Sequence, residues 1–325
     1  MNKIKVAFIF KESNIFLSGN HFDNVFYNFF IKALARNNEI DIEYIHAETE
    51  LDVSKFDDMF DVIILFDNHS WGIPDKLIGI SNLKIPIISR IGDSQNAEKI
   101  GKIDNHNKFN IDYYFSFEPE FYFHKFYPKD FKYQNILFGI EPPLYQNLKE
   151  FDKRLENRIL ITGAVGNPKF SARLLNSLNR KKWSALQCYA LRTKCTTLSY
   201  VDYTPTLSHK YVNDRYPLLL EKYRATIAAT TYLANAKYWE NAAAGCLTFM
   251  EITKLNRGEA LGFVDNKSAI FINEYNYKEK FSEYLQDIDN PKWKEIAVRG
   301  REFALEKFSN DRGVESLVSL IKELI

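Results

Sequence analysis

Short apolar runs alternate with longer amphipathic stretches along the whole chain. Several runs in its first part are almost uninterrupted, as in strands that are covered on both faces. Between the first two runs, the apolar positions of HFDNVFYNFFIKALARNN follow the 3.6-residue period of a helix. This alternation favours a parallel, doubly wound sheet. The predicted strands are KVAFIF (5–10), IDIEYIHA (40–47), DVIILF (61–66), PIISRI (86–91), YYFSF (113–117) and NILFGI (135–140).

A break follows in GIEPPLYQNLKEFDKRLEN (139–157), where a Pro-Pro pair and a charged run predict a linker. The alternation then restarts, and two helical stretches close the chain. We therefore predict an α/β fold with two Rossmann-like domains, joined near residue 145 and facing each other across a cleft that holds the ligands. The predicted strands of the second domain are RILITGA (158–164), SALQCYA (184–190), ATIAAT (225–230), CLTFME (246–251) and AIFIN (269–273).

Length and composition fit this picture and exclude some partners. A chain of 325 residues is long enough for about two domains. The net charge of +1 gives no overall field toward nucleic acid or an anionic membrane. The three cysteines lack metal-ligand spacing, so the expected compartment is the reducing cytoplasm. The N-terminal run is interpreted as a first strand, and no run reaches the roughly 20 apolar residues of a transmembrane helix.

A glycine-containing turn in ILITGAVGNPKFSARLL (159–175) is the first candidate site. A strand ends near Thr162, Gly163 and Gly166 follow, and Asn167-Pro168 is a favourable helix start. Such a turn offers N–H groups to an anion, and Lys169 and Arg173 on one helical face can pair with a diphosphate. An ordinary tight turn with two solvated cations explains the pattern equally well.

The second candidate is Glu240, within NAKYWENAAAGCLTFME (235–251). Asn235 is a suitable N-cap, residues 236–244 are predicted to be helical, and Gly245 suits the position after the helix end. The alanines keep the helix surface thin, so a neighbour or a ligand can come close. Glu240 near the helix start can bind two vicinal ribose hydroxyls, but its spacing alone fits an ordinary glutamate in an early turn better.

Three segments, taken in order, resemble GT-B glycosyltransferases of the group-1 and spore-maturation CgeB-like branch. YLANAKYWENAAAGCLTFME is similar to their nucleotide-binding segment. RILITGAVGNPKFSARLLNSL resembles the opening of their second domain, although Phe170-Ser171-Ala172 stands where Tyr-Pro usually precedes the arginine. NILFGIEPPLY resembles the segment between the domains, with Glu141 where aspartate is usual. The resemblance covers residues 135–310, and the first 135 residues only by strand pattern.

The resemblance implies a glycosyltransferase that uses a nucleotide-diphosphate sugar, linked to UDP or GDP, in surface glycan or glycoconjugate biosynthesis. It implies an acceptor domain (1–145), a nucleotide-sugar domain (146–310) and a final helix (311–325) that returns to the first domain. Glu240 would hold the donor ribose. The other predicted donor-binding residues are Gly163, Lys169, Arg173, Asn235 and Lys237, with Tyr189 and Arg192 near the base.

The acceptor is expected at the strand ends of the first domain. Asp93 and His21 are the two candidates for the base that deprotonates the acceptor hydroxyl, because an acid tends to follow this strand in the family and an imidazole can transfer protons near neutral pH. A lone His or Asp at a strand end is, however, more often a cap or a loop hydrogen-bonding residue. The predicted acceptor contacts are Gly19, Asp23, His69 and Arg90.

No cofactor besides the donor substrate is expected. His21, His69 and His106 lack metal-site spacing, and Lys and Arg side chains with a helix dipole would neutralise the diphosphate, so we predict metal independence. The expected partners are the donor and a glycan, lipid-linked or protein acceptor, without nucleic acid. The final apolar helix leaves a peripheral membrane contact open. Two other functions stay open: a nucleotide-sugar 2-epimerase and a non-catalytic sugar- or nucleotide-binding protein.

Overall fold

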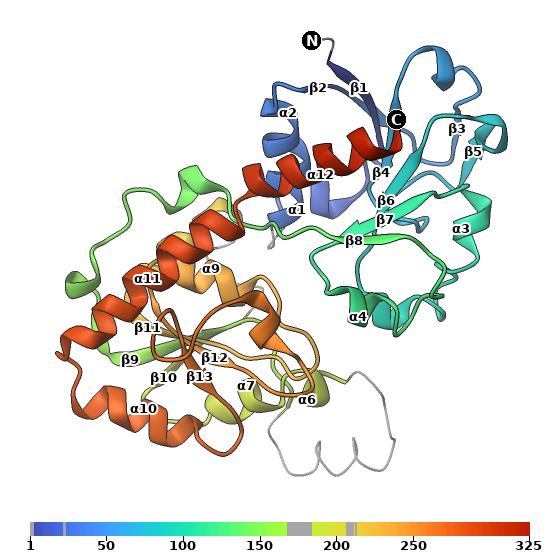
Figure 1. The fold of residues 1–325 in the computed structure, drawn as a ribbon. Helices are drawn as coiled ribbons and strands as arrows, with labels where there is room; N and C mark the ends of the chain where they lie inside the picture. Colours follow the sequence, from blue (N-terminus) through green and yellow to red (C-terminus); the bar gives the residue numbers. More distant parts are fainter. Residues whose placement is uncertain (1–2, 22–23, 168–183, 206–210, 212) are drawn as a thin grey trace. The chain divides into compact units, whose positions relative to one another are not determined.

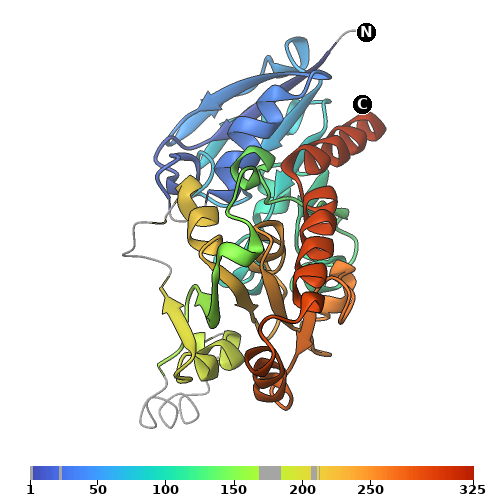
Figure 2. The same cartoon turned by 90° about the vertical axis from the view of Figure 1, so that its left-hand side faces the viewer.

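The computed structural model describes residues 3–21, 24–167, 184–205, 211 and 213–325. The chain forms two compact units: unit 1 is Met1–Glu141 with Ser309–Ile325, and unit 2 is Pro142–Phe308. Each unit contains a parallel sheet with helices beside it (Figures 1 and 2). Within the described part of the chain, no helix is both long and apolar enough to cross a bilayer.

Unit 1 has a six-stranded parallel sheet in the order β2-β1-β4-β6-β7-β8. The apolar runs of the sequence form the strands, because side chains on both faces of the central strands are buried. The strands are β1 (Ile4–Phe10), β2 (Ile40–His46), β4 (Val62–Leu65), β6 (Ile87–Arg90), β7 (Tyr113–Ser116) and β8 (Tyr133–Asn135). A small parallel pair, β3 (Glu50–Asp52) and β5 (Lys76–Ile78), was not predicted.

The last predicted strand of unit 1, at 135–140, is wrong in its bounds. β8 ends at Asn135, and beyond it only Ile140 forms an isolated bridge, to Ser309. The buried residues Ile136 and Phe138 leave the sheet in this run, which packs against α12: a Cβ on Gly313 of that helix would lie 2.9 Å from the Leu137 carbonyl oxygen and from Phe138 Cβ.

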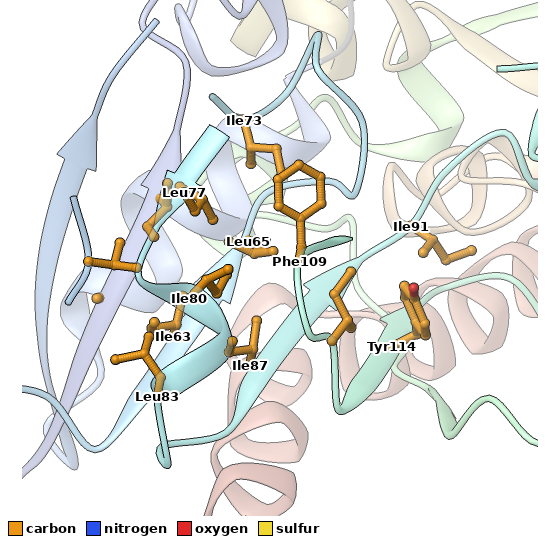
Figure 3. Close-up of a cluster of buried hydrophobic side chains, with 14 of the residues drawn as sticks. Ile63, Leu65, Ile73, Leu77, Ile80, Leu83, Ile87, Ile91, Phe109 and Tyr114 are labelled. Carbon is orange, nitrogen blue, oxygen red and sulfur yellow. The ribbon is translucent and has the colours of Figure 1, made fainter. Parts of the chain in front are cut away.

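The helices of unit 1 are short except for the last. The stretch between β1 and β2 is helical as predicted, with a π-helical segment, Asn28–Ala33, between α1 and α2. One core cluster lies on a face of the sheet, where Ile63, Leu65 and Ile87 meet Ile73 and Phe109 (Figure 3). The helices are α1 (Val25–Tyr27), α2 (Leu34–Arg36), α3 (Asn105–Lys108), α4 (Glu120–Phe123) and α12 (Asn310–Leu324).

Polar contacts attach α12 to the rest of unit 1. The Glu141 carboxylate accepts hydrogen bonds from Arg36 at 2.6 and 3.1 Å and from Asn310 at 3.0 Å. Arg36 also donates to Asp311 at 2.7 Å. The apolar face of the helix, including Leu317 and Ile321, is buried. Glu141 lies where the chain leaves unit 1, and it therefore contacts α12, with which the chain returns to unit 1.

Unit 2 has a five-stranded parallel sheet in the order β10-β9-β11-β12-β13. Its strands are β9 (Leu155–Thr162), β10 (Val201–Thr204), β11 (Tyr223–Ala228), β12 (Leu247–Glu251) and β13 (Ile270–Ile272). Its helices are α6 (Ala185–Cys188), α7 (Ala190–Cys195), α8 (Tyr216–Leu220), α9 (Lys237–Ala243), α10 (Tyr277–Gln286) and α11 (Pro291–Lys307).

The predicted strand SALQCYA (184–190) is wrong, because these residues are helical in α6 and α7. The Ser184 side chain caps the start of α6 by accepting a hydrogen bond from the Gln187 N–H, and alanine, leucine and glutamine favour a helix. The strand beside β9 is instead β10, which begins at Val201.

The small side chains of the α9 alanines allow the neighbouring helix α11 to pack closely against α9. Ala242, Ala243 and Ala244 are fully buried, and α11 packs against α9. A Cβ on Gly300 of α11 would lie 3.9 Å from Ala242 Cβ, and Arg301 of α11 donates to the Ala243 carbonyl oxygen. Small residues on both helices thus allow a close contact that fixes α9 on the sheet.

Candidate functional site

The strand order of unit 2 indicates where a ligand would bind. The next strand in the chain, β10, pairs with one edge of β9. The strand after that, β11, pairs with the other edge of β9. Ligands of open parallel sheets bind beyond the carboxyl ends of the strands at such a reversal. The residues at this point are Thr162 at the end of β9, Gly163 directly after it, and Ala229 and Thr230 after β11.

Gly163 occupies a turn that only glycine adopts readily. Its φ is +99°, and a Cβ would lie 2.8 Å from Arg192 Nη1. Its carbonyl oxygen accepts a hydrogen bond from the Tyr203 hydroxyl at 3.1 Å. The predicted glycine turn therefore exists, held between β10 and a buried arginine. The N–H groups of its two glycines are not offered to an anion, however, because Gly163 N–H donates to the Thr204 carbonyl oxygen at 3.1 Å and Gly166 N–H to Thr193 Oγ1 at 2.8 Å.

Arg192 connects the loop after β9 with the loop after β11 through hydrogen bonds. Its Nε donates to the Ala229 carbonyl oxygen at 3.0 Å and its Nη1 to the Ala164 carbonyl oxygen at 3.1 Å. The guanidinium lies over the Tyr189 ring, 4.6 Å from its centroid, and burial lowers the pKa of Arg192. Tyr189 and Arg192, both predicted near the base, are thus in contact with each other, and Arg192 shapes the turn.

Glu240 is almost buried in α9 and pairs with Lys237. The distance from Lys237 Nζ to Glu240 Oε2 is 3.2 Å. The N-cap of α9 is Ala236 rather than the predicted Asn235, whose side chain accepts a hydrogen bond from the Lys237 N–H at 3.2 Å. These three predicted donor-binding residues therefore lie together, and the structure adds that the ribose-binding candidate is paired with an ammonium group.

Tyr216 is part of this cluster and was not predicted. Lys237 Nζ lies 3.7 Å from the centroid of the Tyr216 ring. A 2.8 Å hydrogen bond links the Tyr216 hydroxyl to Thr162 Oγ1, at the end of β9. In the sequence the residue stands within a stretch that fits an amphipathic helix, and nothing there indicates its contact with Lys237, which lies far along the chain.

Buried polar groups support the loops after β11 and β12. The Tyr238 hydroxyl accepts from the Thr230 N–H at 3.2 Å and donates to the Glu251 carbonyl oxygen at 2.8 Å. Asn256 Nδ2 donates to the carbonyl oxygens of both Thr230 and Glu251. Burial raises the pKa of the Glu251 carboxyl to about 7. Tyr238 packs in the core, as its alanine neighbours suggest, but its hydroxyl also fixes these loops.

Three predicted site residues cannot be placed. Lys169, Arg173 and Asp23 lie outside the described residues. Their predicted roles at the diphosphate and the acceptor stay predictions.

In unit 1, a buried charge network lies beyond β4 and β6. Arg90 Nη2 donates to Asp67 Oδ2 at 2.8 Å, and Lys102 Nζ lies 2.7 Å from Asp67 Oδ1. Arg90 also donates to the carbonyl oxygens of Phe66 and Ile91. These three charged side chains are almost completely buried. Arg90, predicted as an acceptor contact, therefore orders the two loops internally.

Two further acidic residues lie in the same part of unit 1: Asp93, which was predicted, and Glu118, which was not. Asp93 is exposed and has a φ of +52°. Beside it, the buried Ser94 hydroxyl donates to the carboxylate of Glu118, which is also buried. Burial raises the pKa of Glu118 to about 7, and the nearby charge of Asp93 adds to the shift. Glu118 has no motif around it, so its burial could not be read from the sequence.

The candidates near β1 form an aromatic group. The ring centroid of Phe16 lies 4.3 Å from that of buried His21 and 5.5 Å from that of Trp71. His69 Nδ1 accepts from the Trp71 N–H at 3.3 Å, and burial lowers the pKa of His69. Gly19 has a φ of +71°, and a Cβ at this position would contact the Tyr27 ring. Trp71 also lies beneath Lys102, which connects this group to the charge network.

Among the described residues, no group of three His, Cys, Asp or Glu side chains is close enough to hold a metal ion. The sequence does contain an Asp-x-Asp triplet, Asp287–Asp289, a spacing found in metal-dependent transferases. Asp289 pairs with Arg224 at the start of β11, and Asp287 accepts from Asn290. The triplet therefore lies at the amino ends of the strands, opposite the candidate site.

Several solved structures resemble this fold over nearly the whole chain. Sucrose-phosphate synthase from Thermosynechococcus elongatus matches with a TM-score of 0.61 and 10% identity, covering 99% of both chains. Anabaena HepE in complex with UDP-glucose has a TM-score of 0.58 and 10% identity, covering 99% of this chain and 100% of that one. A Rickettsia africae glycosyltransferase has a TM-score of 0.57 and 10% identity, covering 100% and 99%. The chain has the GT-B fold.

The GT-B neighbours confirm the predicted α/β fold class with Rossmann-like sheets. No protein-family model and no curated protein matches the sequence. The narrower CgeB-like branch and the residue roles within the GT-B fold stay predictions.

Proposed function

We propose that this protein is a glycosyltransferase that moves a sugar from a nucleotide-diphosphate sugar to a hydroxyl acceptor. The main support is the cluster at the strand reversal of unit 2, where Glu240, Lys237 and the Gly163 turn combine a carboxylate, an ammonium group and a glycine turn. The GT-B fold agrees, since HepE was solved with UDP-glucose and an α-glucosyltransferase with UDP.

In this proposal the residues of unit 2 bind the donor. The Glu240 carboxylate accepts hydrogen bonds from the ribose hydroxyls, while Lys237 and the turn at Gly163 contact the diphosphate. Lys169 and Arg173 add positive charge there, Asn235 holds the start of α9, and Tyr189 with Arg192 lies nearer the base. No metal ion is needed, because the cations neutralise the leaving nucleoside diphosphate.

Unit 1 would bind the acceptor and supply the base. Asp93 is the better candidate of the two, since it is exposed beyond β6 whereas His21 is buried against Phe16. In an inverting reaction the base removes the proton of the acceptor hydroxyl as its oxygen attacks the anomeric carbon. Gly19, Asp23 and His69 would contact the acceptor, and Arg90 would hold their loops.

We further propose a glycan or glycoconjugate acceptor, a CgeB-like relationship and a cytoplasmic site of action. One structural neighbour, an α-glucosyltransferase, was solved with UDP-glucose and DNA. For the present chain a net charge of +1 supplies no excess positive charge for nucleic acid, so a glycan acceptor is the better proposal.

The test is thermal unfolding with UDP, GDP and their glucose or mannose conjugates, followed by a sugar-release assay. A ligand at about 100 times its dissociation constant stabilises the fold by about 2.7 kcal/mol. We expect stabilisation of the wild type by one nucleotide class and none for Glu240→Ala. Glu259→Ala, at an exposed glutamate of the same unit, is the matched control and should keep the shift.

A shift retained in Glu240→Ala would refute the ribose assignment. Asp93→Asn and His21→Ala should both bind the donor, and only the variant of the base should lose transfer. Conversion of the donor sugar without an acceptor would indicate the 2-epimerase, and binding without any turnover would indicate a non-catalytic protein.

A further inference from the structure

Tyr216 touches two parts of the candidate donor site that come from distant segments. Its ring lies under Lys237 Nζ, at 3.7 Å from the centroid. Its hydroxyl contacts Thr162 Oγ1 at 2.8 Å and donates to Asn241 Oδ1 at 3.4 Å. One side chain thus links the end of β9, next to the Gly163 turn, with two successive turns of α9.

The Lys237 ammonium interacts with both Glu240 and Tyr216. It is 3.2 Å from Glu240 Oε2, and it lies over the Tyr216 ring within the range of a cation–π contact. Lys237 has 28% of its side chain exposed, against 9% for Glu240. A partly exposed ammonium that two groups already hold in place is ordered before a donor binds.

We propose that Tyr216 is a positioning residue for the donor, whose ring holds Lys237 where it can serve both Glu240 and the diphosphate of a nucleoside diphosphate. This inference rests on the proposed function. Without the ring, the flexible lysine chain is free to pair with Glu240 alone, and the carboxylate then competes with the diphosphate for it. With the ring, part of the ordering is complete before the donor arrives.

The state of the phenol agrees with this role. Burial raises the pKa of Tyr216, although the charge of Lys237 lowers it in part. The phenol is therefore neutral at neutral pH and leaves the positive charge of Lys237 intact for the donor.

The experiment is a double-mutant cycle on binding, measured by isothermal titration with UDP, or GDP if the wild type prefers it, and with the matching nucleoside. Tyr216→Leu should weaken nucleoside diphosphate binding about tenfold and nucleoside binding much less. Tyr216→Phe keeps the ring and should stay within about threefold of the wild type. In a transfer assay the loss should fall on the KM for the donor rather than on kcat.

The cycle isolates the route through Lys237. If Tyr216 acts through this lysine, the double variant Tyr216→Leu/Lys237→Met binds no worse than Lys237→Met alone. Tyr211→Leu is the matched control, because Tyr211 carries a comparable contact with Lys222, 4.2 Å from its ring centroid. It should bind the nucleotide as the wild type does.

Additive effects in the cycle, or wild-type affinity in Tyr216→Leu, would overturn the inference. If Glu240→Ala loses binding while Tyr216→Leu keeps it, only the role of Tyr216 fails; if the wild type binds no nucleoside diphosphate, the proposed function fails as well.

Should Tyr216→Leu not fold, Lys237→Met is compared in the wild type and in Tyr216→Phe. An equal loss in both supports the ring, and a smaller loss in the Phe background overturns its role.

Discussion

Glu118 shows how a single buried carboxyl group links stability to pH. Its side chain is held by Ser94 and surrounded by the charges of Asp93 and Lys102. The pKa is raised from 4.5 to about 7, chiefly because burial disfavours the charged form. Between these two values the folded protein binds more protons than the unfolded chain. The contribution of Glu118 to the free energy of unfolding therefore falls as the pH rises from about 4.5 to about 7.

We predict that Glu118→Gln reduces this pH dependence. The amide cannot ionise but its oxygen can still accept from Ser94, so the variant should gain on the order of 1–3 kcal/mol relative to the wild type between pH 5 and pH 8. Urea unfolding at both pH values measures the difference.

Glu120→Gln is the control for this measurement, because Glu120 is an exposed carboxylate close by in the chain. It should change the pH dependence very little. Parallel pH profiles for the wild type and Glu118→Gln would show that Glu118 does not titrate in this range.

At the level of elements, the turn after β9 depends on a residue without a side chain. Gly163→Ala would place a methyl group 2.8 Å from Arg192 Nη1, at a φ of +99°. We predict a loss of about 1–2 kcal/mol from the backbone strain and, on the proposed function, at least tenfold weaker nucleotide binding as Arg192 is displaced. Denaturant unfolding and nucleotide titration measure the two effects.

Gly101→Ala separates strain from site geometry. Gly101 has a φ of +72°, but a Cβ there meets nothing within 4 Å. This variant should lose similar stability and keep nucleotide binding. Equal loss of binding in both variants would argue against a specific role for the Gly163 turn.

The strands of the sheets were largely predictable, and the reason is physical. Residues such as Ile63 and Phe249 are buried in strands covered on both faces, so their runs are continuous and apolar. The error at SALQCYA shows the weakness of this signal: a short apolar run can be a helix, and the Ser184 cap decided between the two. β10 was missed because Asp202 and Tyr203 interrupt its apolar pattern at the sheet edge.

The candidate site was predictable only where its residues are close in sequence. Asn235, Lys237 and Glu240 share one short segment, and the structure places them together. Tyr216, Glu118 and the Arg192 contacts depend on burial and on distant partners, which no local pattern encodes. Arg90 was predicted to contact the acceptor because the sequence does not reveal that its side chain is buried beside Asp67.

At the level of the whole molecule, α12 completes unit 1 although it follows all of unit 2 in the chain. We predict that Leu317→Ala, in the buried face of α12, costs about 2–5 kcal/mol through lost contacts and a cavity. Hydrogen exchange measured by mass spectrometry should show the lost protection in residues 3–141 and in α12.

Ser319→Ala, on the exposed side of the same helix, is the control and should leave exchange unchanged. Faster exchange confined to residues 142–308 would contradict the assignment of α12 to unit 1.

The place of α12 has a consequence for how the protein is made. A ribosome releases residues in order, so the first 141 residues emerge early but lack their covering helix until Ser309 and its successors follow. Unit 2 is one uninterrupted segment and can be finished before then. The later-made half of this protein can therefore mature first, while the earlier half waits with an apolar surface that a chaperone could shield.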